Sequence, residues 1–138
     1  MQVVVDANII FSALIGGRLT DLFLSSKLDL VAPELIFVEF LRNKEELIRR
    51  SKLSEEDFNI LLTLLERRIK VIPFEEFEDL FSKAEELLGD HIKDAPYVAL
   101  ALKLKCPFWT YEKRFKKIRE VKCLTTEDIA KIVNELDN

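Results

Sequence analysis

Four acidic residues occupy positions where a carboxylate could take part in chemistry instead of being only a solvated surface charge. They are Asp6, Glu39, Asp94 and Glu112. A group of carboxylates without thiolate or imidazole partners selects hard cations that prefer oxygen ligands, such as Mg²⁺ or Mn²⁺. Two such ions held close together can orient water and stabilise the transition state of phosphodiester hydrolysis. If these acids converge, the sequence predicts a divalent metal site that acts on phosphodiesters.

Asp6 and Glu39 each allow a structural as well as a functional interpretation. Asp6 directly follows the apolar run Val3–Val5, and Asp is also a good N-cap for a helix that begins at the next residue. Position alone favours neither interpretation. Glu39 lies within the apolar segment Leu35–Leu41, where a carboxylate is costly unless it is paired, protonated or bound to a cation. This favours a functional Glu39, although an exposed stripe shared with Arg42 and Asn43 would also accommodate it.

Asp94 and Glu112 carry weaker individual signals. Asp94 precedes Ala95-Pro96 and an apolar segment, so taken alone it is better interpreted as an N-cap, because proline suits the first helical turn. Glu112 follows an expected strand, where it could instead favour the positive end of a short helix capped by Thr110. Their neighbours Asp90 and His91 are interpreted as loop residues.

The elements that must position these acids follow from the hydrophobic pattern. Short apolar runs predict strands at Val3–Val5, Leu30–Ala32, Ile69–Ile72, Phe108–Thr110 and Val121–Leu124. Apolar residues spaced by three and four predict helices at Ala7–Leu14, Leu19–Leu28, Glu34–Arg50, Ser54–Arg67, Glu75–Leu88, Ala95–Lys105, Glu112–Lys117 and Thr126–Leu136. Strands that alternate with helices imply parallel pairing. We therefore expect an α/β fold with three layers, α/β/α, around a central, mostly parallel sheet.

Length and composition restrict the class of protein. A chain of 138 residues with 49% hydrophobic content suits one domain, expected over residues 1–138. Two cysteines and one histidine argue against a structural zinc site. No apolar run approaches the roughly 20 residues of a membrane span, and the N-terminus lacks the basic region of a signal peptide. We expect a cytoplasmic protein with reduced cysteines and no membrane association.

The charge is unevenly distributed. The chain has a formal charge of −4, yet residues 103–122 hold eight basic and two acidic side chains. This basic stretch includes Lys113 and Arg114 and is interleaved with Trp109, Tyr111 and Phe115. Such a pattern suits contacts to the phosphates of a nucleic acid. A solvated helix face with buried aromatic residues is the alternative. We prefer it for Phe115 and keep it open for Trp109.

Four segments resemble the PIN-domain nucleases, a family that includes the toxins of many prokaryotic toxin–antitoxin pairs. The matching segments are Val3-Val4-Val5-Asp6-Ala7-Asn8, Phe37-Val38-Glu39, Asp94-Ala95-Pro96-Tyr97-Val98-Ala99-Leu100-Ala101 and Phe108-Trp109-Thr110-Tyr111-Glu112-Lys113. Their order and separations are similar to those of the family over almost the whole chain.

The resemblance implies that Asp6, Glu39 and Asp94 form an acidic metal site, with Asn8 and Thr110 as polar helpers. PIN domains usually carry Asp at the position of Glu112, so this chain keeps the charge there on a side chain one methylene longer. The expected function is a metal-dependent endoribonuclease, plausibly a toxin held by a cognate antitoxin. The alternatives are a DNA nuclease and a non-catalytic interaction domain of the same fold.

A homodimer is also expected. The helix Ser54–Arg67 carries more apolar residues than one buried stripe requires, and a large exposed apolar patch usually marks an interface. These residues are Leu61, Leu62, Leu64 and Leu65. Burial between two neighbouring helices of the same chain is the alternative.

Overall fold

A parallel sheet forms the centre of the molecule in a computed structural model that describes residues 1–16, 18–90 and 92–137. Its strands are β1 (Gln2–Val5), β2 (Asp29–Pro33), β3 (Ile69–Ile72), β4 (Phe108–Trp109) and β5 (Cys123–Leu124). They lie in the order β3-β2-β1-β4-β5, and each neighbouring pair is parallel. The run Val3–Val5 is fully buried because β1 is the central strand, which confirms the interpretation of this run as a buried parallel strand.

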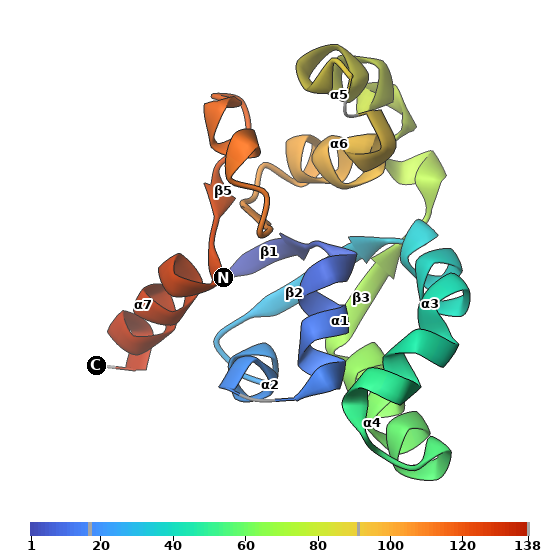
Figure 1. Ribbon diagram of the computed structural model, residues 1–138. Helices are drawn as coiled ribbons and strands as arrows, with labels where there is room; N and C mark the ends of the chain where they lie inside the picture. The colour runs from blue at the N-terminus through green and yellow to red at the C-terminus, as the bar shows by residue number, and fades with distance from the viewer. Residues whose placement is uncertain (17, 91, 138) are drawn as a thin grey trace.

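Helices cover both faces of this sheet. Figure 1 shows α5 and α6 on one face and α1 and α2 on the other, with α3 and α4 beside α1. The helices are α1 (Ala7–Ile15), α2 (Arg18–Phe23), α3 (Leu35–Ser51), α4 (Glu55–Arg68), α5 (Phe81–Leu88), α6 (Ala95–Leu104) and α7 (Thr126–Asp137). The predicted three-layer α/β/α architecture is confirmed, and the whole sheet is parallel.

Several predicted elements differ in extent. The predicted helix Glu75–Leu88 is two short 3₁₀ turns, η1 (Phe74–Glu76) and η2 (Glu78–Leu80), followed by α5. The chain leaves helical geometry at Phe77, whose φ is −131° and whose ring is buried against Phe74. Burial of this ring therefore overrides the local helical pattern.

Other predicted boundaries shift in the same way. The predicted helix Leu19–Leu28 is shorter and ends at Phe23, while Glu112–Lys117 is a 3₁₀ segment, η4 (Lys113–Lys117). A further 3₁₀ turn, η3 (Ile92–Asp94), precedes α6. The interpretation of His91 as a loop residue lies outside the described residues.

The helix ends follow the signals in the sequence. The hydroxyl of Ser54 accepts a hydrogen bond from the backbone N–H of Asp57 at 3.0 Å, as an N-cap does. Gly89 ends α5 with a φ of +57°, a conformation that costs glycine little. These caps explain why α4 begins and α5 ends where the sequence predicts.

Helix α4 buries only part of its apolar surface. Leu65 is fully buried and Leu61 and Leu62 are half-buried, whereas Leu64 remains 48% exposed and Ile60 56% exposed. Burial within the chain thus accounts for some of these leucines, and the homodimer stays a prediction. Among the described residues, no helix combines the length and the apolar character needed to cross a membrane.

Candidate active site

The four predicted acids line a single cleft at the carboxyl ends of β1 and β4. The chain continues from β1 to β2 on one side, while β4 pairs with β1 on the other, so this is the point at which the strand order reverses. Ligands of open parallel sheets bind at such a point. The cleft measures about 620 Å³, and its polar lining comprises Asp6, Asn8, Ser12, Glu39, Arg42, Asn43, Glu46, Arg50, Lys93, Asp94, Tyr111 and Glu112.

Asp6 is held at the floor of the cleft by hydrogen bonds from two sides. Its Oδ1 accepts from the backbone N–H of Asn8 at 3.3 Å, and its Oδ2 accepts from the hydroxyl of Thr110 at 2.8 Å. The Thr110 hydroxyl also accepts from the backbone N–H of Glu112 at 3.1 Å. Thr110 therefore joins the end of β1 to the segment that carries Glu112.

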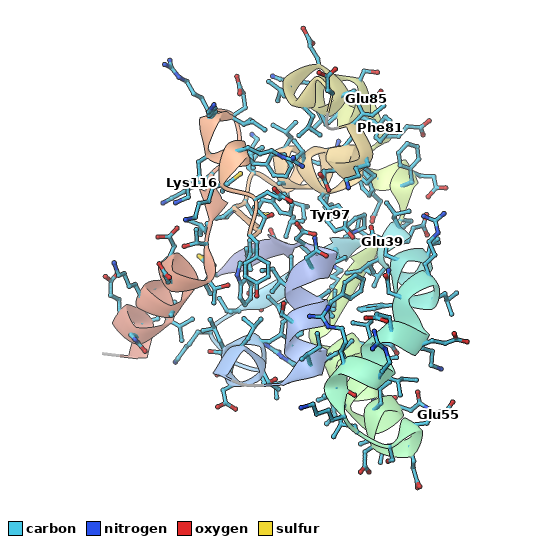
Figure 2. The ribbon with its side chains drawn as sticks, viewed as in Figure 1. Glu39, Glu55, Phe81, Glu85, Tyr97 and Lys116 are labelled. Carbon is cyan, nitrogen blue, oxygen red and sulfur yellow. The ribbon has the colours of Figure 1, made fainter. Side chains whose placement is uncertain are left out.

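Glu39 points from α3 toward α6, where a buried tyrosine holds it. The hydroxyl of Tyr97 donates a hydrogen bond to Oε1 of Glu39 at 2.8 Å, and Figure 2 shows the two residues beside each other. Tyr97 is 1% exposed. The exposed stripe expected with Arg42 and Asn43 is real, but these residues line the cleft together with Glu39. The functional interpretation of Glu39 and its interpretation as part of an exposed stripe thus describe the same surface.

Asp94 and Glu112 share one cationic neighbour. The guanidinium of Arg114 lies 3.6 Å from a carboxylate oxygen of Asp94 and 3.6 Å from one of Glu112. Asp94 stands at the N-cap position of α6 but makes no side-chain capping hydrogen bond. The predicted N-cap position of Asp94 is therefore confirmed, but its side chain does not cap the helix, and the carboxylate faces the cleft.

The acids in the cleft act on one another electrostatically. Burial raises the pKa of Asp6, the nearby charge of Glu112 raises it further, and the hydrogen bond from Thr110 opposes both. Burial, followed by the charge of Asp6, also raises the pKa of Asp94. For Glu39, burial raises the pKa most, the charges of Asp6 and Asp94 add to it, and the Tyr97 hydrogen bond opposes it. The metal-free cleft therefore disfavours full ionisation.

The donor chemistry of this cleft fits a divalent cation. In the part of the chain that the structure describes, no three His, Cys, Asp or Glu side chains are already assembled as a metal-binding group. The four acids nevertheless offer only oxygen donors to one cleft, and their charges repel. Oxygen donors suit Mg²⁺ or Mn²⁺, and a divalent charge would relieve the repulsion.

The remaining residues expected at the site divide into two groups. Asn8 and Thr110 lie beside Asp6, as expected of polar helpers. Arg114 reaches two acids, whereas Lys113 is exposed and does not line the cleft. Tyr97 was not anticipated. The available signal was a single hydroxyl three residues after Asp94 in an otherwise aliphatic helix.

The aromatic residues of the basic stretch divide into buried residues and one that is exposed at the cleft. Phe115 is buried and its ring stacks on Phe108 at 6.1 Å, so the preferred structural interpretation of Phe115 is confirmed. Trp109 is fully buried as well, and its indole N–H donates to Thr126 at 3.0 Å. Tyr111, in contrast, is 46% exposed and lines the cleft.

Comparisons with known proteins agree with this geometry. The model of a family described as PIN domain matches residues 4–133. No curated protein matches the chain. Among solved structures, a chain of VapBC2 from Rickettsia felis bound to a DNA fragment from their promoter superposes with a TM-score of 0.68 at 15% sequence identity. That match covers 91% of this chain and 98% of the other, so the two share a fold.

Proposed function

We propose that this chain, which belongs to the PIN-domain family, is a metal-dependent endoribonuclease that hydrolyses RNA phosphodiester bonds. The family consists of nucleases. The observation that carries the proposal is that Asp6, Glu39, Asp94 and Glu112, which come from four separate segments, line one cleft. Stability of the fold does not explain such a cluster, because in the absence of a metal ion the carboxylates repel one another and destabilise the folded state.

The acids would hold Mg²⁺ or Mn²⁺ in this cleft. When bound, the cation supplies activation of water and stabilisation of the charge that develops on the phosphate. The protein contributes orientation: Thr110 fixes Asp6, and Tyr97 fixes Glu39. Loss of a hydrogen-bond partner of this kind typically lowers metal affinity or activity about 10–100-fold.

Single-stranded RNA is the substrate class that we propose. The basic residues around η4 suit contacts to phosphates, which position a strand without reading its sequence. Single strands expose a flexible phosphate that can enter an open cleft. A DNA substrate is the competing outcome of the experiment below.

The decisive experiment compares labelled RNA and DNA of identical sequence with Mn²⁺ or with chelator. We expect the wild type to cut RNA only with Mn²⁺, and Asp6→Asn to lose most of that activity. Asp21→Asn is the matched control, because it removes the same charge from an exposed residue of α2 outside the cleft. Faster cleavage of DNA would overturn the RNA assignment, and equal cleavage by Asp6→Asn would overturn the site.

A protein partner, an antitoxin, is part of the proposal. The similar solved structure is that of VapBC2 bound to a DNA fragment from their promoter, and the PIN-domain nucleases that this chain resembles include the toxins of many toxin–antitoxin pairs. In this chain Phe37, Val38 and Leu41 of α3 are 43%, 42% and 77% exposed, respectively, and large exposed apolar patches usually mark interfaces. None of these three residues lines the acidic cleft, so this surface of α3 is separate from the one that carries Glu39.

The toxin role has its own test. Expression of the wild type should arrest bacterial growth, while Asp6→Asn should not, and co-expression of a small neighbouring reading frame should restore growth. Leu41→Lys should prevent that rescue without reducing toxicity. Normal growth with active wild-type nuclease would contradict the toxin role and leave the nuclease assignment in place.

A further inference from the structure

A second pocket lies beside the acidic cleft, between the end of α5 and the η4 segment. Figure 1 shows these two segments on the same side of the sheet, and Figure 2 labels Glu85 on α5 and Lys116 on η4. The walls are apolar. Leu87 and Leu88 contribute from α5, and Phe115 and Ile118 from η4 and the residue that follows it. Leu87 and Ile118 are only half-buried, so apolar surface remains accessible there.

The rim of this pocket is basic. Arg114, Lys117 and Arg119 line it, against a single acidic lining residue, Glu120. All four are exposed. The guanidinium of Arg114 also lies over the ring of Phe115, 5.0 Å from its centre, which holds a flat cationic group above an apolar surface. An apolar wall with a cationic rim matches a ligand that is itself a flat ring joined to anionic groups.

Arg114 connects this pocket to the cleft. It lines the pocket, and the same guanidinium lies 3.6 Å from Asp94 and 3.6 Å from Glu112. A strand whose phosphate lies between the acids would therefore pass Arg114 and meet the pocket next. The pocket is thus placed to receive a neighbouring nucleotide of the same strand.

We infer that this pocket is a nucleotide subsite, in which the base of a nucleotide near the scissile bond packs against Leu87 and Ile118 while the adjoining phosphates contact Lys117 and Arg119. This inference rests on the proposed RNA substrate. Apolar contact of this kind accepts any base, because every base has a π-face. The subsite therefore contributes affinity and register along the strand.

The test measures RNA binding in chelator, so that no cleavage occurs. The probes are a fluorescent single-stranded RNA and a matched ribose-phosphate oligomer that lacks bases, both followed by fluorescence anisotropy. We expect the wild type to bind the RNA several-fold more tightly than the abasic oligomer, because the bases bury apolar surface against Leu87 and Ile118. Ile118→Ser should lose most of that difference. Leu87→Ala is the second wall variant should Ile118→Ser fold poorly, as judged by circular dichroism.

The rim is tested with the pair Lys117→Ala and Arg119→Ala. This variant should bind both oligomers more weakly by the same factor, and its dependence of log Kd on log salt should fall by about 0.7 for each phosphate that the protein no longer neutralises. The matched control, Lys70→Ala with Lys131→Ala, removes the same charge from exposed residues outside the pocket. We expect the control to keep the wild-type salt dependence.

Equal binding of both oligomers by the wild type would overturn the subsite, and so would an unchanged base preference in both wall variants. Equal weakening in the rim variant and its control would also contradict the inference, because a general charge effect would then explain binding. Cleavage with Mn²⁺, measured on the same preparations, tests the proposed function separately. If the wild type cuts RNA with Mn²⁺ but the wall substitutions do not change the base preference, the subsite is refuted and the proposed function stands.

Discussion

Asp94→Asn provides the sharpest test of the acidic cleft, because its effect on stability should change sign with metal. Asp94 makes no capping hydrogen bond, so the amide costs α6 nothing at its N-terminus. Burial and the charge of Asp6 disfavour the ionised carboxylate, and the substitution removes that unfavourable charge. It also removes the ion pair with Arg114 at 3.6 Å.

The magnitude follows from these opposing terms. A partly exposed ion pair such as that with Arg114 contributes about 0.2–1 kcal/mol, and relief from repulsion offsets its removal. In chelator the variant should therefore melt at or slightly above the wild-type temperature. With metal at about 100 times its dissociation constant, the wild type should gain roughly 2.7 kcal/mol. For 138 residues this corresponds to a rise of roughly 9 °C in Tm.

The pH dependence has a definite sign. Folding raises the pKa of Asp94, so the folded state binds this proton more tightly than the unfolded chain does. Any stability linked to that proton is fully present below the unfolded pKa of 3.8 and is lost as pH rises through the folded pKa. The stability of Asp94→Asn relative to the wild type should therefore increase from pH 4 toward neutrality in chelator.

Thermal melts of three proteins, each with chelator and with Mn²⁺, provide the assay. Asp94→Asn should lose most of the rise caused by Mn²⁺, whereas Asp21→Asn should show the full rise because its side chain is exposed and outside the cleft. Equal metal responses in all three proteins would refute the acidic metal site. Marked destabilisation of Asp94→Asn in chelator would refute the argument from charge repulsion.

Three further variants test individual contacts. Tyr97→Phe should fold normally and raise the Mn²⁺ dissociation constant roughly tenfold in calorimetry, since Glu39 loses its hydrogen-bond donor; unchanged affinity would show that Tyr97 does not position Glu39. Glu112→Asp should maintain or raise the cleavage rate and Glu112→Ala should lower it, while an unchanged rate and metal dependence in Glu112→Ala would remove this acid from the site. Leu64→Lys should convert a dimer to a monomer in light scattering, because Leu64 is 48% exposed; a monomeric wild type at micromolar concentration would contradict the predicted homodimer.

The sequence predicts the sheet well because burial of parallel strands leaves a direct signal. Val3–Val5 is an apolar run, and Ile69–Ile72 is a β-branched run interrupted by Lys70. Both are too short for helices, and both are strands in the structure. The region from Phe74 to Leu80 is predicted less well. Its pattern suits a helix, but burial of Phe77 against Phe74 and the departure of Phe77 from helical geometry depend on the packed structure.

The same distinction applies to the cleft. Glu39 could be singled out because a carboxylate among apolar residues needs a local explanation. Its partner Tyr97 lies 58 residues away, and a tyrosine in an apolar helix is equally typical of a core, so only the fold reveals the contact. Arg114 is similar: the sequence identifies a basic stretch, but its approach to both Asp94 and Glu112 requires tertiary structure.

Asp6 shows that the structural and functional interpretations of a residue need not exclude each other. Its Oδ1 accepts the N–H of Asn8 at the start of α1, and its Oδ2 accepts the hydroxyl of Thr110. A carboxylate offers about four lone-pair sites, so these two bonds leave capacity for a ligand in the cleft. The hydrogen bonds also fix the side chain before any cation arrives, which reduces the ordering that binding requires. The backbone N–H of Asn8 and the hydroxyl of Thr110 thus preorganise Asp6, the acid that the proposed chemistry uses.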